Sequence, residues 1–175
     1  MKLKIYQVDA FTDKLFSGNP AAVCPLEKWL SDATLQNIAD ENNLAETAFF
    51  VKTADNYHIR WFTPKAEVDL CGHATLATAF ILFELMNYTQ EIISFQSRSG
   101  ILTVKKHDNW LTLNFPMDTV QETEITDKLL RCFDKKPLEA LEGLADFMLV
   151  FSNQNDIENI QPNLNAIAEF KKRGI

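Results

Sequence analysis

The fold depends on one stretch of sequence, Asp69-Leu-Cys-Gly-His-Ala-Thr-Leu-Ala-Thr-Ala-Phe-Ile-Leu-Phe-Glu-Leu85. From Ala74 to Phe83 every residue is apolar or small, so a helix here would be hydrophobic on nearly every side and must be surrounded by other apolar groups. The segment from Ala74 to Met86 would be about 20 Å long, whereas the hydrocarbon core of a bilayer is about 30 Å thick. We therefore expect a helix that is buried in protein and does not cross a membrane.

Short runs with β-strand patterning lie on both sides of this helix and would supply its cover. They are interrupted by turn residues such as Arg98-Ser-Gly100 and His107-Asp-Asn109. The expected strands cover residues 3–10, 45–52, 57–63, 91–96, 100–106 and 109–115. A further helix should begin after Ser31 as N-cap and end near Asn42-Asn43. The sequence thus predicts an α+β fold in which a barrel-like, curled β-sheet surrounds a central apolar helix.

The chain changes character after Phe115-Pro116, where Gln121-Glu-Thr-Glu124 suggests a linker. We expect an N-terminal barrel-like domain over residues 1–116, and a linker with the start of a truncated second domain over residues 117–175. The later part shows helical patterns at 126–134 and 164–170 and a strand pattern at 146–151. These strands are too few to close a barrel, which predicts an incomplete second domain.

The composition restricts the classes of partner. The 175 residues carry a formal net charge of -7 with scattered basic residues, which argues against nucleic-acid binding because phosphate contacts need clustered Lys and Arg. No export signal is visible at the N-terminus. The three cysteines, Cys24, Cys71 and Cys132, fit neither a disulfide framework nor a CxxC metal site. A reducing cytoplasm is the expected location.

Two segments contain residues that could perform chemistry. Cys71-Gly-His-Ala74 would lie at the start of the buried helix, where unpaired backbone N–H groups favour an anion such as a carboxylate. Gly72 would allow a ligand to approach the backbone closely, and His73 could donate to the anion or carry a proton. The alternative is a tight entry turn without a ligand. Cys71 could be a proton-transferring base or a small apolar filler.

Glu46 is the second candidate, an acid within Leu44-Ala-Glu-Thr-Ala-Phe-Phe50. A carboxyl group with apolar and small neighbours could act as a general acid or base, whereas a strand residue that faces solvent would have no such role. The histidines His58, His73 and His107 are isolated in the sequence, and no pair has the spacing of a zinc site. We therefore expect no metal. Nucleotide-binding glycine motifs are also missing from the sequence.

Several motifs, in this order along the chain, resemble those of the PhzF-like (phenazine biosynthesis) proteins of the diaminopimelate epimerase superfamily. The resemblance is strong over residues 1–116 and loose thereafter. It rests on Val8-Asp-Ala-Phe11, Phe16-Ser-Gly-Asn-Pro-Ala-Ala-Val23, Asn43-Leu-Ala-Glu-Thr-Ala-Phe49, Arg60-Trp-Phe-Thr-Pro64, Glu67-Val-Asp-Leu-Cys-Gly-His-Ala-Thr75 and Ser97-Arg-Ser-Gly100.

The resemblance implies two similar domains, each a curled sheet around a central helix, with the active site between the N-termini of the two helices. It implies that Glu46 moves a proton between carbon atoms and that His73 lies beside the substrate. Gly72 and its neighbouring amides would hold a carboxylate, and Asn19 and Cys71 would also line the substrate site. The implied reaction is a cofactor-free isomerisation of a small carboxylic acid, such as a cyclohexadiene carboxylic acid.

Two other functions remain as alternatives. The chain ends at Arg173-Gly-Ile175, where relatives of this kind continue into the opposite wall of the cleft. It could therefore be a catalytically silent binding or assembly module, with Phe147, Leu149 and Phe151 exposed for pairing. A homodimer or a complementary C-terminal domain would be the partner. A cysteine-based racemase using Cys71 is less favoured, because no second catalytic thiol is evident.

Overall fold

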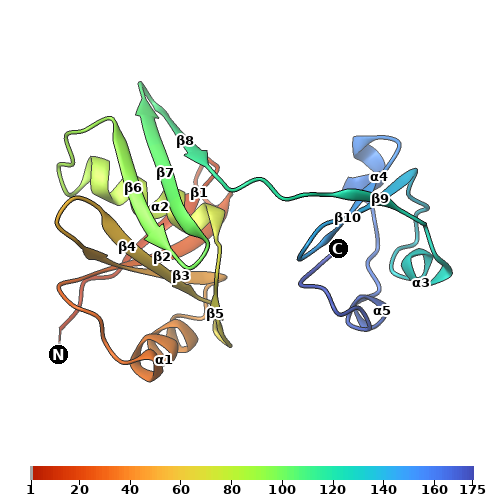
Figure 1. Ribbon diagram of the computed structural model, residues 1–175, viewed down its shortest axis with the longest axis horizontal. Helices are drawn as coiled ribbons and strands as arrows, with labels where there is room; N and C mark the ends of the chain where they lie inside the picture. The colour runs from red at the N-terminus through yellow and green to blue at the C-terminus, as the bar shows by residue number, and fades with distance from the viewer. Residues whose placement is uncertain (1) are drawn as a thin grey trace. The chain divides into compact units, whose positions relative to one another are not determined.

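The computed structural model describes residues 2–175 (Figure 1). The chain divides into two compact units, Met1–Pro116 and Met117–Ile175, which are described separately below. Among the described residues, no helix is both long enough and apolar enough to cross a membrane.

The first unit is built on one mixed sheet of eight strands with the order β1-β2-β3-β4-β6-β7-β8, and β5 beside β4. Most neighbours are antiparallel, but β2 pairs with β3 and β4 pairs with β6 in parallel. The strands are β1 (Tyr6–Ala10), β2 (Asn19–Leu26), β3 (Glu46–Lys52), β4 (Tyr57–Phe62), β5 (Glu67–Val68), β6 (Ile92–Ser97), β7 (Gly100–His107) and β8 (Trp110–Asn114).

The helix α2 (Gly72–Glu84) lies within the curve of this sheet, as Figure 1 shows. Most of its side chains are buried, and those of Ala74, Ala79 and Leu82 are completely so. They pack against alternate residues of the strands, which point to the same face because successive strand side chains alternate. This inner core includes Val23, Ala48, Phe50, Ile59, Trp61, Ile93, Phe95, Leu102 and Val104. The predicted α+β arrangement, a curled sheet around a central apolar helix, is confirmed.

The helix α1 (Asp32–Asn42) covers the other face of the sheet. Ser31 is its N-cap, and its side chain accepts a hydrogen bond from the Thr34 backbone N–H. The helix ends at Asn43, which has the left-handed conformation that often terminates helices. Leu35 and Ala39 are buried against a second, smaller core on this outer face. The helix therefore has the limits that the sequence predicts.

The second unit contains a three-stranded antiparallel sheet in the order β11-β10-β9, with three short helices. The strands are β9 (Gln121–Thr123), β10 (Glu139–Glu142) and β11 (Phe147–Val150), and the helices are α3 (Asp127–Leu130), α4 (Gln154–Glu158) and α5 (Leu164–Ile167). Both expected helices are shorter than predicted, since 126–134 and 164–170 each contain only a single four-residue helix. In α3 the cause is a β-bridge between Phe133 and Pro162, which needs extended backbone where the helical pattern continues.

The expectation that Phe147, Leu149 and Phe151 would be exposed was wrong. All three are half-buried, because the short helices and loops of this unit fold onto the sheet. The ring of Phe147 packs edge-on against Phe170 with 5.5 Å between centroids, and Phe151 packs similarly against Phe133 at 6.2 Å. The exposed apolar side chain of β11 is instead Met148.

Candidate active site

Glu46 is the first residue of β3, and its side chain points to the side of the sheet that faces α2. The alternation along β3 shows this, because Ala48 and Phe50 on the same face both belong to the inner core. Only 21% of the Glu46 side chain is exposed. The alternative in which Glu46 is a solvent-facing strand residue does not fit this placement.

The N-terminus of α2 lies on the same side of the sheet. Cys71 is the N-cap residue, and its side chain makes no capping hydrogen bond. No acidic residue occupies the first turn, so the partial positive charge of the helix end has no carboxylate from its own turn. Deeper in the helix, the hydroxyl of Thr75 donates to the Cys71 carbonyl at 2.5 Å. The open backbone donors are therefore those of the first residues, beginning at Gly72.

His73 lies between a carboxylate and a thiol. Its Nε2 atom is 3.2 Å from Glu46 Oε2, and its Nδ1 atom is 3.5 Å from Cys71 Sγ. The His73 residue is 8% exposed. Nε2 is close to the carboxylate, yet this buried nitrogen has no hydrogen-bond partner among residues 2–175. The fold thus brings together Glu46, Cys71 and His73, while one polar atom among them stays unsatisfied.

Burial determines the ionisation of Cys71. Burial removes the thiol from water and is the main reason that its pKa is raised to about 12. The nearby Glu46 carboxylate also raises the pKa. The backbone amide of Ala74 acts in the opposite direction but does not compensate. Near neutral pH the side chain is therefore an uncharged thiol, which is a poor base.

The space where a side chain at Gly72 would lie is occupied by an aromatic ring. A Cβ atom built on Gly72 would lie 2.9 Å and 3.0 Å from two ring carbons of Phe115. Phe115 directly follows β8, and its side chain is partly exposed. The missing side chain at Gly72 therefore accommodates an aromatic ring. Sequence reasoning missed Phe115 because nothing in its local pattern distinguishes it from the end of a strand.

Asn19 begins β2, at the same end of the sheet as Glu46. In the parallel pair β2–β3, Ala21 lies opposite Glu46, and Asn19 is on the same face as Ala21 two positions earlier. The residue before it, Gly18, has φ of 83°, and a Cβ there would be 2.4 Å from the Ala10 carbonyl oxygen. The structure thus places Asn19 on the α2 side of the sheet, but outside the cluster formed by Glu46, Cys71 and His73.

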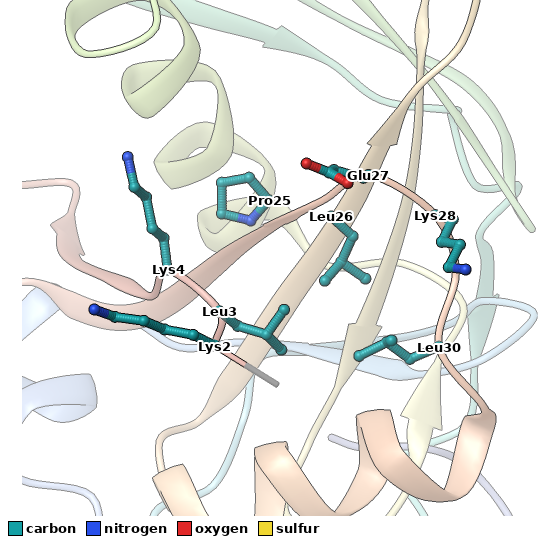
Figure 2. Close-up of a pocket in the computed structure, with 8 residues that line it drawn as sticks. All are labelled: Lys2, Leu3, Lys4, Pro25, Leu26, Glu27, Lys28 and Leu30. Carbon is teal, nitrogen blue, oxygen red and sulfur yellow. The ribbon is translucent and has the colours of Figure 1, made fainter.

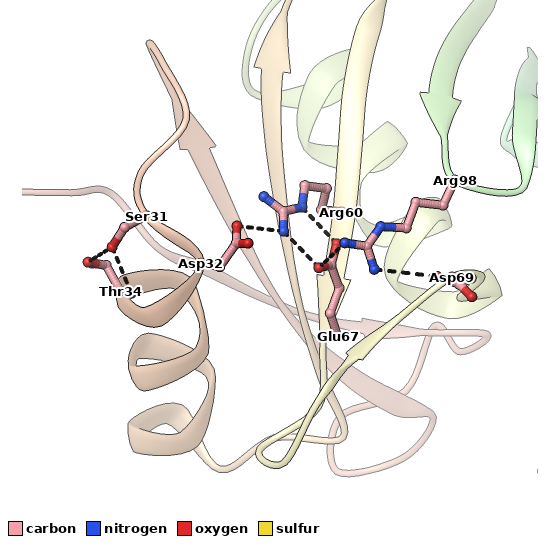
Figure 3. A network of polar contacts seen from close by, with 7 residues as sticks. All are labelled: Ser31, Asp32, Thr34, Arg60, Glu67, Asp69 and Arg98. Carbon is pink, nitrogen blue, oxygen red and sulfur yellow. Dashed lines mark hydrogen bonds and ion pairs between the residues drawn. The ribbon is translucent and has the colours of Figure 1, made fainter.

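A network of ion pairs supports the segment that leads into α2 (Figure 3). The Arg60 guanidinium donates to both oxygens of Glu67 at 2.7 Å and to Asp32 at 2.8 Å. Arg98 contacts Glu67 at 2.6 Å and Asp69 at 3.5 Å. The hydrogen bond to Glu67 is the main reason that the pKa of Arg60 lies above its usual value. The network therefore joins α1, β4, β5 and the β6–β7 turn to the residues just before Cys71.

The same cluster has the composition of a metal site. One ligand atom from each of Glu46, Cys71 and His73 can be chosen so that all three lie within 4.8 Å of one another. Cys71 and His73 are two residues apart at the start of α2, and the packing of α2 against the sheet brings the carboxylate of Glu46 on β3 to them. The spacing in the sequence gave no signal of the contact with Glu46.

A hollow of about 400 Å³ lies elsewhere on the first unit (Figure 2). It contains none of the predicted site residues, and its lining combines lysines with apolar side chains and one acid. The lining residues are Lys2, Leu3, Lys4, Pro25, Leu26, Glu27, Lys28 and Leu30. The cluster at the N-terminus of α2 is therefore the better candidate for an active site.

A family model described as phenazine biosynthesis-like protein matches residues 8–175. An uncharacterized isomerase of Pseudomonas aeruginosa is 43% identical over 175 residues, which is 100% of this chain and 67% of the relative.

Solved structures show the same likeness. The crystal structure of a phenazine biosynthesis protein of the PhzF family from Enterococcus faecalis has a TM-score of 0.90 and 44% identity, covering 98% of this chain and 66% of that one. A predicted epimerase from Pseudomonas aeruginosa is only 16% identical, yet it has a TM-score of 0.69 over 98% of this chain and 68% of its own. The fold is thus of the diaminopimelate epimerase type, as predicted, and the chain spans about two thirds of the length of these proteins.

Proposed function

Because the chain belongs to the phenazine biosynthesis-like protein family, we propose that it is a PhzF-like isomerase or the N-terminal part of one. The proposed reaction moves a proton between two carbon atoms of a small carboxylic acid, without a cofactor. Relatives named as isomerases and the epimerase-type fold support the general class of enzyme.

One observation carries the proposal: the Glu46 carboxylate and the His73 imidazole meet at the N-terminus of α2, 3.2 Å apart. A proton at a carbon atom next to a carboxylate needs a base that is positioned and partly shielded from water. Glu46 meets this requirement, since it is mostly buried and still 21% exposed. It would remove the proton as a carboxylate and return it to another carbon as a carboxylic acid, so that no proton is lost overall.

The first turn of α2 would bind the carboxylate of the substrate. Unpaired backbone N–H groups and the helix dipole favour an anion there, and no acidic side chain of the first turn competes for the position. His73 would donate from Nε2, the nitrogen that has no hydrogen-bond partner in the part of the chain that the structure describes. The Phe115 ring, which lies against Gly72, would provide an apolar wall for the carbon skeleton.

Cys71 has a different role in this proposal. Its thiol is protonated near neutral pH because burial raises its pKa to about 12, so it would line the substrate site without removing a proton. This ionisation argues against the alternative in which Cys71 is the base of an amino-acid racemase. We also assign Asn19 to the substrate site, from its position at the same end of the sheet as Glu46.

The proposal includes a partner that completes the site. The chain spans about two thirds of the length of its relatives, so a complementary C-terminal domain or a second copy would supply the opposite wall. Native mass spectrometry of the purified chain should come first. A dimer or a complex supports this part of the proposal, whereas a strictly 20.0 kDa monomer that turns over substrate would contradict it.

Solvent exchange tests the chemistry. The chain, with its partner if one is found, is incubated in deuterated water with cyclohexadiene carboxylic acids, and deuterium at carbon is followed by NMR. We expect incorporation by the wild type and none by Glu46→Gln. Glu41→Gln is the matched control, because Glu41 is an exposed residue of α1 on the other face of the sheet. Incorporation that persists in Glu46→Gln would remove Glu46 as the base, and a lack of exchange in the wild-type complex would favour the binding-module alternative.

A further inference from the structure

We propose that Glu46, Cys71 and His73 form a binding site for a thiophilic divalent cation, with Zn²⁺ as the ion that fits best. The three residues bring a carboxylate, a thiol and an imidazole to one place, with their ligand atoms within 4.8 Å of one another. Neither the sequence spacing nor the proposed isomerisation calls for a metal at this place. The inference therefore goes beyond the proposed function.

Each of two contacts in the cluster has the length expected between neighbouring ligand atoms of tetrahedral zinc. Zinc binds sulfur at about 2.3 Å and nitrogen or oxygen at about 2.0 Å, which places neighbouring ligand atoms about 3.3–3.6 Å apart. The observed Cys71 Sγ to His73 Nδ1 distance is 3.5 Å, and His73 Nε2 to Glu46 Oε2 is 3.2 Å. These two contacts use different nitrogens of one ring, and a single ion takes only one. Binding of all three ligands to one ion therefore requires a rotation of the ring or a movement of a neighbouring side chain.

An independent observation also points to a ligand. His73 is more than nine-tenths buried, and from Lys2 to Ile175 no group forms a hydrogen bond with its Nε2 atom, although a carboxylate oxygen is close. Buried polar atoms are nearly always paired, because an unpaired one loses its interaction with water. A cation between Nε2 and Glu46 would satisfy the nitrogen and neutralise the carboxylate at the same time.

The ligand types select the kind of ion. Ca²⁺ and Mg²⁺ prefer oxygen ligands, whereas thiolate and imidazole together favour Zn²⁺ and similar metals. On binding, the Cys71 S–H bond would break, a Zn–S bond would form, and the proton would leave to solvent. Three protein ligands leave the fourth position of the ion open to water or to a carboxylate.

Such an ion would occupy the base that we propose for catalysis. Zn²⁺ would therefore inhibit the isomerase, and a chelator would restore it. This consequence rests on the proposed function, but the metal site does not, because binding can be measured without any substrate. A chain that binds metal and shows no exchange would retain the metal site while losing the proposed reaction.

The test is a Co²⁺ titration of the full chain without an affinity tag, followed by displacement with Zn²⁺. Cobalt reports on the ligands directly, through a thiolate charge-transfer band in the near ultraviolet and visible bands that indicate tetrahedral geometry. We expect one equivalent to bind with both signals, and Zn²⁺ to remove them. Cys71→Ala should abolish the charge-transfer band, and His73→Gln should weaken binding by more than the roughly 10–100-fold seen when outer-shell partners are removed.

Two further variants serve as controls for Cys71→Ala and His73→Gln. Cys24→Ala removes another buried thiol, and His107→Gln removes an exposed histidine, and both should bind Co²⁺ as the wild type does. A band that survives in Cys71→Ala, or one that is lost in Cys24→Ala, would overturn the assignment. X-ray absorption of the zinc-loaded wild type needs no variant and guards against misfolding. One sulfur at about 2.3 Å with nitrogen or oxygen at about 2.0 Å is expected, and a shell of oxygen alone would overturn the proposal.

Discussion

Glu46 and His73 lie 3.2 Å apart, on a strand and a helix that are separated in the sequence by β4, β5 and their connections. Their meeting is a property of the fold, because the first residue of β3 points toward α2 and His73 is the second residue of that helix. Neither residue could be moved by one position and keep the contact, since a shift along β3 would turn the side chain to the outer face. The pair is therefore held by the same alternation that builds the inner core.

The stability of the chain should fall as the pH rises above 9, in part because of Cys71. Burial raises the pKa of this thiol to about 12 in the folded chain, from an ordinary value of 9.0. Between these values the unfolded chain loses the proton first, so stabilisation present below pH 9 is lost as the pH approaches 12. A single group of this kind lowers the free energy of unfolding by about 1 kcal/mol at roughly pH 10 relative to neutral pH.

Urea denaturation of the wild type and Cys71→Ala at neutral pH and near pH 10 measures this effect. The difference in free energy of unfolding between the two proteins should shrink by about 1 kcal/mol at the higher pH. Comparing the two proteins at each pH removes the contribution of Cys24, whose pKa is also raised by burial, to about 11. Parallel pH profiles for the two proteins would show that Cys71 titrates normally.

Neutralising Glu67 should destabilise the first unit. Its carboxylate, only 13% exposed, accepts two hydrogen bonds from Arg60 and pairs with Arg98. Glu67→Gln would leave two guanidinium groups without their shared partner, although Asp32 and Asp69 remain in contact with them. We expect a loss of about 2 kcal/mol, less than the 3–5 kcal/mol of a fully buried pair.

The control for this variant is Asp40→Asn. Asp40 pairs with Lys65 at 3.9 Å, and both side chains are well exposed, so the loss should stay within about 0.5 kcal/mol. Urea midpoints of both variants provide the measurement. Equal losses for the two would mean that the network in Figure 3 does not stabilise the fold.

The sequence predicted the features that depend on local pattern. The apolar run after His73 indicates a buried helix, the Ser31 cap marks the start of α1, and alternation marks most of the strands. The first unit follows these expectations except at β2 and β5, which were not among the expected strands. In the second unit, a β-bridge at Phe133 ends α3 early, and such a pairing with a distant segment leaves no local mark in the sequence.

The candidate site also contains some features that the local sequence predicts and others that depend on contacts between distant residues. Cys71, Gly72 and His73 are adjacent, so their position at a helix start follows from the prediction of that helix. The contact of Phe115 with Gly72 joins residues distant in the sequence, and it depends on how β8 ends beside α2. Only the three-dimensional arrangement shows it, just as only the arrangement shows that His73 meets the carboxylate of Glu46.

The contact between Gly72 and Phe115 predicts a coupling between two substitutions. Gly72→Ala alone would push a methyl group to 2.9 Å from the ring, which should cost about 1–3 kcal/mol unless the partly exposed ring swings away. In a Phe115→Ala background the same change should be neutral or stabilising, because Ala is the better helix former. A double-mutant cycle from urea denaturation should therefore give a coupling of at least about 0.5 kcal/mol. Additive effects would place the ring away from Gly72.

Gly18, in the loop before Asn19, and Gly100, the first residue of β7, form a matched pair of glycines. Gly18 and Gly100 both have positive φ, 83° and 94°, so alanine at either position carries the cost of a left-handed conformation, about 1–2 kcal/mol. They differ in the surrounding space, since a Cβ at Gly100 meets nothing within 4 Å, while one at Gly18 lies 2.4 Å from the Ala10 carbonyl oxygen. Backbone is less able to move than a side chain end, so Gly18→Ala should lose at least about 1 kcal/mol more than Gly100→Ala. Urea midpoints measure the difference, and equal losses would mean that the loop relaxes around the new methyl group and that the approach to Asn19 is not fixed by Gly18.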